Sequence, residues 1–283
     1  GEKHGLHTRV FINSQGLPTY ETKELGLNKA KFEKEPDLDT SIIVTANEQS
    51  DYFRVVLAAM KEVMPTVAEK TRHLAHGMLR FASGKMSSRK GNVITGESLI
   101  EQVRELVREK IKERDFSDSE KEKVSEIVAV GAIKYSILRQ AIGGDITFDF
   151  DKSISFEGDS GPYLQYSFVR AKSVLAKAEK EGIKSDFKEV SKSDLNKSEI
   201  IPLERLLYRF PEVVERAGVE YQPHYITTFL TELAGAFNSW YAKEQIVVVE
   251  DPTSSYKIAL TGAFATTMKN GLHLLGIKVP ERM

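Results

Sequence analysis

The pattern of apolar and polar positions predicts an α/β arrangement in the first third of the chain. Residues 41–46 (SIIVTA) form a short β-branched apolar run, which is typical of a strand buried on both faces. In residues 50–63, four apolar side chains share one helical face: Phe53, Val56, Leu57 and Met60. The tip between this strand and helix, residues 47–50 (NEQS), is where a βα unit places ligand-binding side chains. Residues 8–20 predict a hairpin around a Gly-containing turn.

Helical periodicity dominates after residue 96. Apolar residues recur at helical spacing in residues 97–114, at Leu99, Val103, Leu106 and Ile111. Ser117 and Glu120 form a capping-box pattern, and the helix that they start is expected to end at Gly143-Gly144. The residues expected to face inward from this helix are Val124, Ile127, Gly131, Ile137 and Leu138. After an extended segment at 145–151, Pro162 is well placed in a first helical turn.

The last part of the chain is expected to be a helical bundle. Its apolar stripes are Leu164, Phe168, Ala171 and Leu175, then Phe229, Leu233, Phe237 and Trp240, then Leu260, Phe264, Met268, Leu272 and Leu275. The predicted fold class is therefore α/β followed by all-α. The predicted domain boundaries are 1–96, 97–155 and 156–283.

Composition narrows the class of protein. The chain has 283 residues, 41% of them hydrophobic and 29% charged, which is ordinary for a globular protein. Its formal net charge of -1 means that any nucleic-acid binding needs a local basic face. No apolar run reaches the ~20 residues of a membrane helix. With no cysteine the chain has no disulfide, so we expect a cytoplasmic protein without a membrane partner.

Candidate chemistry is concentrated in residues 84–93 (GKMSSRKGNV). The cations of Lys85, Arg89 and Lys90 can neutralise phosphate oxygens, and the two serines between them can donate hydrogen bonds. Gly84 and Gly91 allow the backbone to close over a ligand. The alternative interpretation of such a segment is a solvated basic loop.

The string KMSSRKGN resembles the KMSKS signature loop of class I aminoacyl-tRNA synthetases, with Ser88 in place of the second lysine of the signature. That loop stabilises the ATP triphosphate while the amino-acid carboxylate attacks the α-phosphate. The resemblance implies catalytic roles for four residues: Lys85, Ser87, Ser88 and Lys90. It also implies ATP, with Mg²⁺, as a substrate that contacts Met78, Lys85 and Met86, and no metal ligands among the protein side chains.

Two further segments are similar to arginyl-tRNA synthetases. Residues 18–27 (PTYETKELGL) resemble the Tyr-x-Thr-x-Asp segment of the arginine pocket, which implies that Tyr20 packs on arginine and Glu24 binds its guanidinium. Paired hydrogen bonds to a carboxylate are the best means of recognising a planar guanidinium. Residues 47–53 (NEQSDYF) resemble the segment that supplies a glutamine to the same pocket, here Gln49, with Tyr52 where the family commonly has His.

The helical part resembles the anticodon-binding domain of the same family. Residues 155–173 (SFEGDSGPYLQYSFVRAKS) are similar to its opening helix, where Tyr163, Tyr166 and Arg170 fall on positions that approach the anticodon. Aromatic rings stack on unpaired bases, and arginine pairs with phosphate or stacks. The chain end (NGLHLLGIKVPERM) is similar too, and it implies that Met283 approaches the anticodon. The resemblance extends from Thr8 to Met283, and it implies a partial Rossmann-type catalytic domain before a helical anticodon-binding bundle.

Neither the second class I signature, His-x-Gly-His, nor the family's N-terminal tRNA-binding domain has a counterpart among these residues. We therefore expect the C-terminal part of an arginine–tRNA ligase that is inactive in isolation. The expected partners are tRNA(Arg), L-arginine, ATP and the missing N-terminal half of the same enzyme.

Other interpretations stay open at this point. Tyr20 could pack on a hairpin, Glu24 could be a solvated acid, one of Tyr163 and Tyr166 could be core, and Met283 could be frayed. The chain could bind tRNA without chemistry. It could also be a different class I synthetase such as the cysteine enzyme, although the lack of cysteine and the Tyr20–Glu24 segment argue against that.

Overall fold

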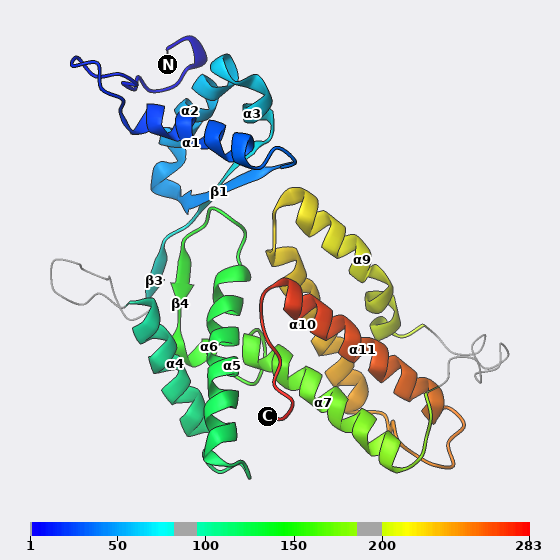
Figure 1. Cartoon of the computed structure of the whole chain (residues 1–283). Helices are drawn as coiled ribbons and strands as arrows, with labels where there is room; N and C mark the ends of the chain where they lie inside the picture. The colour runs from blue at the N-terminus through cyan, green and yellow to red at the C-terminus, as the bar shows by residue number, and fades with distance from the viewer. Residues whose placement is uncertain (1, 82–94, 186–199) are drawn as a thin grey trace. The chain divides into compact units, whose positions relative to one another are not determined.

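The computed structural model describes residues 2–81, 95–185 and 200–283 (Figure 1). The chain divides into two compact units. Unit 1 comprises Gly1–Leu79 with Ile142–Asp145, and unit 2 comprises Arg80–Ala141 with Ile146–Met283. The predicted phosphate loop, residues 84–93, lies outside the described residues.

Unit 1 contains the predicted βα unit. A parallel pair of strands, β1 and β2, places Ser41 opposite Thr71 and Ile43 opposite His73. The Phe53 ring stacks on His73 at 4.2 Å, and thereby fixes one helix on the sheet. The elements of this unit are η1 (Glu2–His4), α1 (Tyr20–Lys34), β1 (Ser41–Ala46), η2 (Asn47–Gln49), α2 (Ser50–Val63), α3 (Pro65–Glu69) and β2 (Thr71–His76). The tip therefore lies where β1 gives way to α2, as predicted: residues 47–49 lie between the two elements, and Ser50 begins α2.

The expectation that β1 is buried on both faces is wrong. Ile42 is 47% exposed and Val44 is 62% exposed, whereas Ser41 is buried. Successive strand residues point to opposite faces, and the face of Ile43 and His73 is the one that Phe53 covers. Within the described residues the other face of this two-stranded sheet presents its apolar side chains to solvent.

The predicted hairpin at residues 8–20 is reduced to a tight turn. One isolated antiparallel bridge joins Ile12 and Pro18, and the turn between them uses Gly16 at φ +76°. Tyr20 is not a hairpin core residue, because it begins α1 and is 79% exposed. The packing interpretation of Tyr20 is therefore wrong.

Unit 2 starts with a small sheet and two helices. Strands β3 (Leu79–Phe81) and β4 (Ile146–Phe148) pair, and their Phe81 and Phe148 rings meet edge to face. The helices here are α4 (Gly96–Lys110), α5 (Asp118–Leu138) and the short α6 (Phe150–Ser153). The capping box of Ser117 and Glu120 is confirmed, since both of its hydrogen bonds form.

Two details of α4 and α5 differ from expectation. Helix α5 ends at Leu138, five residues before the Gly-Gly pair, and Ile137 is 37% exposed instead of facing inward. In α4, Leu106 is 38% exposed and Val107 is fully buried, because the buried positions follow a strict four-residue spacing from Leu99.

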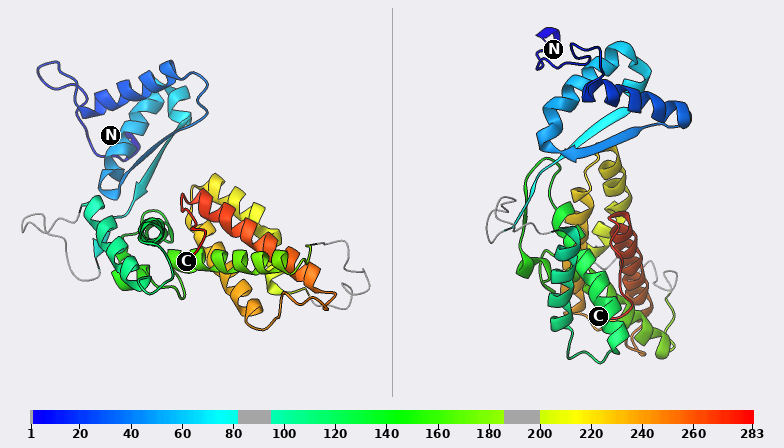
Figure 2. Two further views of the ribbon diagram at one scale, coloured as in Figure 1. Left: turned by 60° about the horizontal axis from the view of Figure 1, so that its bottom comes forward. Right: turned by 60° about the vertical axis from the view of Figure 1, so that its left-hand side comes forward.

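The remaining helices form one bundle with a common core. They are α7 (Gly161–Lys180), α9 (Pro202–Glu220), α10 (His224–Tyr241) and α11 (Ser254–Leu274). Figures 1 and 2 show α7 and α11 side by side, and α9 next to α10. All three predicted stripes contribute to this core, with Leu164, Leu233, Phe237, Phe264 and Met268 essentially inaccessible. Pro162 lies in the first turn of α7, as predicted, and Ser160 caps this helix.

The bundle is tied to α5 by a close helix crossing. A Cβ atom at Gly161 would lie 2.5 Å from the carbonyl oxygen of Gly131, so the backbones meet there without side chains between them. Next to the crossing, the buried Gln165 Nε2 donates to the carbonyl oxygens of Ile127 (3.2 Å) and Lys278 (2.7 Å). This fixes the C-terminal segment, and Met283 packs against the bundle core, so the expectation of a frayed end is wrong.

Candidate functional site

The first candidate site lies at the start of α1 in unit 1. Tyr20 and Glu24 are four residues apart in this helix, so their side chains share one face. Glu24 is half-buried, and its Oε1 accepts a hydrogen bond of 2.9 Å from Nδ2 of the fully buried Asn28. That bond orients the carboxylate. Among the described residues no cationic side chain lies within ion-pair distance of Glu24.

Tyr52 joins the start of α2 to this cluster. Its hydroxyl donates to the Tyr20 carbonyl at 3.2 Å, and the Arg9 guanidinium lies 5.5 Å from the centre of its ring. Arg9 also pairs with the buried Glu21 at 3.5 Å. Burial raises the pKa of the Tyr52 hydroxyl, and the nearby carboxylates of Glu24 and Glu21 raise it further. The Tyr52 hydroxyl is thus held neutral beside the carboxylates of Glu24 and Glu21, and only that of Glu21 has a cationic partner, Arg9, among the described residues.

The other predicted residues of this site are less closely assembled. Gln49 is exposed and immediately precedes α2, one turn before Tyr52. Met78 is 40% exposed, and its backbone N–H donates to Asp145 Oδ1 at 3.0 Å. The five predicted loop residues lie outside the described residues: Lys85, Met86, Ser87, Ser88 and Lys90.

The second candidate site is a cation–aromatic stack in the helical bundle. The Arg170 guanidinium lies 4.9 Å from the centre of the Tyr166 ring and 5.2 Å from that of Tyr241. It therefore contacts one aromatic ring from its own helix, α7, and one from the end of α10. All three side chains are at least partly accessible, so the stack presents π-faces and a positive charge to a ligand.

Asn238 of α10 orients this stack. Its Oδ1 accepts from Arg170 at 2.5 Å, and its Nδ2 donates to the Tyr163 hydroxyl at 3.0 Å and to Ser167 Oγ at 2.9 Å. Tyr163 is therefore a member of this hydrogen-bond network, and its partly buried side chain also packs against the core of the bundle. The structure thus brings Tyr163, Tyr166 and Arg170 together around Asn238.

Sequence reasoning missed several members of both clusters. These are Arg9, Glu21 and Asn28 in the first and Ser167, Asn238 and Tyr241 in the second. A signal existed for Asn238, because it is a polar residue directly after the buried Phe237. A polar side chain in that position needs partners, which can be sought on the facing helix.

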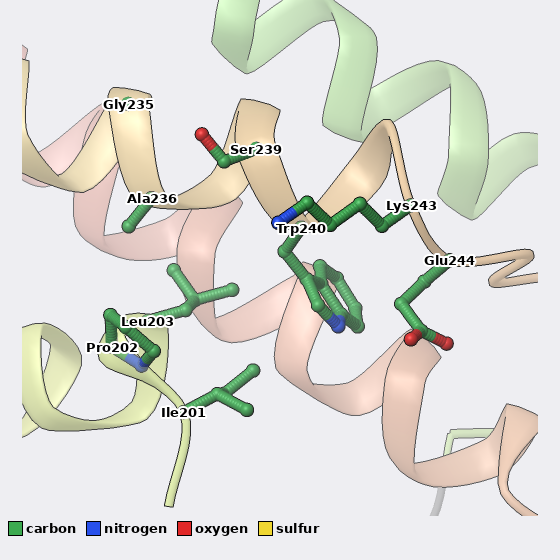
Figure 3. Close-up of a pocket in the computed structure, with 9 residues that line it drawn as sticks. All are labelled: Ile201, Pro202, Leu203, Gly235, Ala236, Ser239, Trp240, Lys243 and Glu244. Atoms are coloured by element: carbon green, nitrogen blue, oxygen red, sulfur yellow. The ribbon is translucent and has the colours of Figure 1, made fainter.

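A cavity of 430 Å³ opens on the other side of α10. Figure 3 shows Ile201, Pro202 and Leu203 on the wall formed by the start of α9, facing Ala236, Ser239 and Trp240 of α10. Trp240, expected in the core, packs on the core and also lines this cavity.

Neither a metal site nor a membrane span is found where the structure is described. No group of three or more His, Cys, Asp or Glu side chains is placed to hold a metal ion there. None of the helices in the same residues is long and apolar enough to cross a bilayer.

Comparison with known families shows which family this chain belongs to. The family model "tRNA synthetases class I (R), catalytic domain" matches residues 4–150, more than half of the chain. The chain belongs to the arginyl-tRNA synthetase family. The model "DALR anticodon binding domain" matches residues 164–283, which contain Arg170 and Asn238.

Curated relatives agree with this assignment. The chain is 32% identical over its whole length to "Arginine--tRNA ligase" of Ligilactobacillus salivarius and 34% identical to that of Streptococcus agalactiae. In both cases the match covers 49% of the relative, so the chain spans about half the length of the curated relatives it matches. The alternative of a cysteine-specific synthetase is thereby set aside.

Solved structures give the same fold. "Thermus thermophilus arginyl-tRNA synthetase" superposes with a TM-score of 0.80 at 27% identity, over 97% of this chain and 51% of that one. The arginyl-tRNA synthetase of Plasmodium falciparum superposes with a TM-score of 0.76 at 18% identity, which supports the fold alone. The predicted fold class, a class I catalytic domain followed by a helical anticodon-binding domain, is confirmed.

Proposed function

We propose that this chain takes part in the ATP-dependent activation of arginine and its transfer to tRNA(Arg). In this proposal residues 1–96 belong to the catalytic domain, 97–155 connect it to the bundle, and 156–283 bind the anticodon. The observation that carries the proposal is the Tyr166–Arg170–Tyr241 stack within a domain of the anticodon-binding family.

The arginine pocket is proposed at the start of α1. Glu24 receives the guanidinium of the substrate, because its carboxylate is oriented by Asn28 and carries no cation among the described residues. Tyr20, largely exposed on the same helical face, packs on the substrate side chain. Gln49 approaches from the tip before α2. A charge-assisted, paired contact favours arginine over lysine, whose ammonium lacks the planar fork.

The ATP side rests on residues 84–93 and on Met78. Lys85 and Lys90 neutralise the triphosphate in the proposal, and Ser87 and Ser88 donate to its oxygens, while Met78 and Met86 contact the nucleotide. The carboxylate of arginine attacks the α-phosphate and displaces pyrophosphate, and a terminal hydroxyl of the tRNA then attacks the arginyl carbonyl carbon and displaces AMP. No cluster of acidic residues in the described ranges fits a dedicated Mg²⁺ cage, so Mg²⁺ is expected to arrive bound to the ATP phosphates.

The tRNA side rests on the bundle. In the proposal unpaired anticodon bases stack on Tyr163 and Tyr166, and Arg170 contributes charge. Met283, which follows the segment that Gln165 anchors at Lys278, approaches the same bases. Such binding is electrostatic in part, so it weakens with salt. A chain that only binds tRNA is the second candidate, because the 283 residues contain no His-x-Gly-His string to stabilise the other side of the α-phosphate.

Arginine-dependent ATP–pyrophosphate exchange, measured with and without tRNA(Arg), separates the two candidates. The proposal expects no exchange from this chain alone, and exchange when residues bearing His-x-Gly-His are supplied in the same polypeptide. In that active form Lys85→Ala is expected to slow exchange ~10–1000-fold. An unchanged rate for Lys85→Ala excludes the proposed role of the loop.

A further inference from the structure

A second carboxylate lies beside the proposed arginine pocket in unit 1. Glu21 and Glu24 are three residues apart in α1, so their side chains share one face of the helix. Burial raises the pKa of the Tyr52 hydroxyl, and the carboxylates of Glu24 and Glu21 raise it further, so both acids lie near the same ring. A guanidinium that enters at this end of α1 therefore meets two carboxylates.

The chain's own Arg9 occupies Glu21. Its guanidinium lies 3.5 Å from the Glu21 carboxylate and 5.5 Å from the centre of the Tyr52 ring. The Glu21 side chain is only 11% exposed, so its charge needs a partner, because an unpaired buried carboxylate is strongly destabilising. Arg9 is thus held by one carboxylate and one tyrosine ring.

Glu24 offers the same chemistry to a ligand, but it has no cation. Its half-buried carboxylate accepts a hydrogen bond of 2.9 Å from Asn28, and no cationic side chain of the described ranges lies within ion-pair distance of it. Tyr20, on the same helical face, supplies the exposed ring. Two similar guanidinium sites therefore lie side by side on α1, and the chain itself fills one of them.

We propose that Arg9 is a positioning residue for the substrate, because it blocks Glu21 and leaves Glu24 as the one carboxylate that an arginine can reach. The inference rests on the proposed arginine pocket and deepens it. Three residues of helix correspond to about 4.5 Å along the helix axis. A guanidinium held at Glu21 would move the reacting carboxylate of the substrate by a comparable distance, and a shift of even ~1 Å is enough to slow a reaction greatly.

The test is the kinetics of arginine-dependent ATP–pyrophosphate exchange in the active form, in which residues bearing His-x-Gly-His are joined to this chain. In Arg9→Gln the uncovered Glu21 is expected to bind the guanidinium unproductively. Unproductive binding lowers kcat and the KM for arginine by the same factor and leaves kcat/KM unchanged. The expected factor is about 2 if Glu21 binds as well as Glu24, and about 10 if it binds ~1.4 kcal/mol better. The KM for ATP is expected to stay the same.

Two variants are expected to keep wild-type kcat and KM. In Arg9→Gln/Glu21→Gln the competing negative charge is gone, and in Arg9→Lys an ammonium group still covers Glu21. Arg54→Gln is the matched control, because Arg54 also lies 3.5 Å from a carboxylate, that of Asp51, whose side chain is 58% exposed on α2. It is expected to leave both constants unchanged.

Two results would overturn the inference while the proposed function stands. A lower kcat/KM for Arg9→Gln, accompanied by a lower Tm, would mean that Arg9 only stabilises the fold. Unchanged kcat and KM would mean that the substrate does not reach Glu21. In both cases a raised KM for arginine in Glu24→Gln would still support the pocket. If Glu24→Gln has the wild-type KM, or if exchange does not depend on arginine, the proposed pocket and this inference fail together.

Discussion

Replacing Asn238 tests whether one amide orients the anticodon stack. Asn238→Ala removes a hydrogen bond to the Arg170 guanidinium and two to neutral hydroxyl groups, those of Tyr163 and Ser167. Bonds to charged groups contribute ~1.5–3 kcal/mol and neutral ones ~0.5–1.5 kcal/mol to stability. Because Arg170 is partly accessible, its bond is taken at the lower end of that range, ~1.5 kcal/mol. With the two neutral bonds, the free energy of unfolding of the bundle is expected to fall by ~2.5–4.5 kcal/mol.

Thermal unfolding followed by far-UV circular dichroism measures this loss. For a unit of this size a change of 1 kcal/mol shifts Tm by ~2–4 °C, so the expected decrease is about 5–18 °C. Ser239→Ala is the control, because Ser239 is the exposed neighbour outside the network. RNA affinity is expected to fall with Asn238→Ala even at temperatures where the variant is folded, since Arg170 loses its orientation. If Asn238→Ala has the same Tm as Ser239→Ala and binds RNA with wild-type affinity, the hydrogen bonds of Asn238 do not order the stack.

Three further perturbations check other parts of the account. Gly161→Ala is expected to destabilise the chain by ~1–3 kcal/mol in denaturant unfolding, because the new Cβ would lie 2.5 Å from the Gly131 carbonyl oxygen. Gly262→Ala is the control, since a Cβ at this position in α11 meets open space, and it is expected to be neutral or stabilising. Glu24→Gln is expected to weaken arginine binding by ~1.5–3 kcal/mol in calorimetry on an active form, and equal affinities would contradict the guanidinium contact. Burial lowers the pKa of His73 in the folded chain, so as pH falls the unfolded chain is protonated at this residue first. The stability of unit 1 is therefore expected to fall as pH drops below about 6.5, and to fall less in His73→Gln. An identical pH dependence of stability in the wild type and in His73→Gln would exclude His73 as its source.

Features set by local sequence were predicted well. The capping box at Ser117, the proline in the first turn of α7 and the βα order around residues 47–50 depend on a few neighbouring residues, and the structure has all of them. The stripes of the bundle follow from the 3.6-residue period in the same way.

Features set by distant partners were not predicted. An apolar strand run does not reveal which of its faces is covered, so the exposure of Ile42 and Val44 was missed. The end of α5 was predicted five residues too late, at Gly143, because Arg139 and its successors are compatible with a helix until tertiary context ends it. Asn238 and Tyr241 became site residues only when α10 was placed against α7.

The most direct test of the central claim is equilibrium binding to two RNAs: tRNA(Arg) and the same tRNA with its anticodon loop replaced. The affinity for each RNA is measured with the wild-type chain and with Arg170→Gln. The account predicts that wild type binds the native tRNA more tightly than the loop-replaced one, that affinity falls as salt rises, and that Arg170→Gln removes the preference. Equal affinity of the wild-type chain for both tRNAs, or a preference that survives Arg170→Gln, would contradict the claim that the stack at Arg170 reads the anticodon.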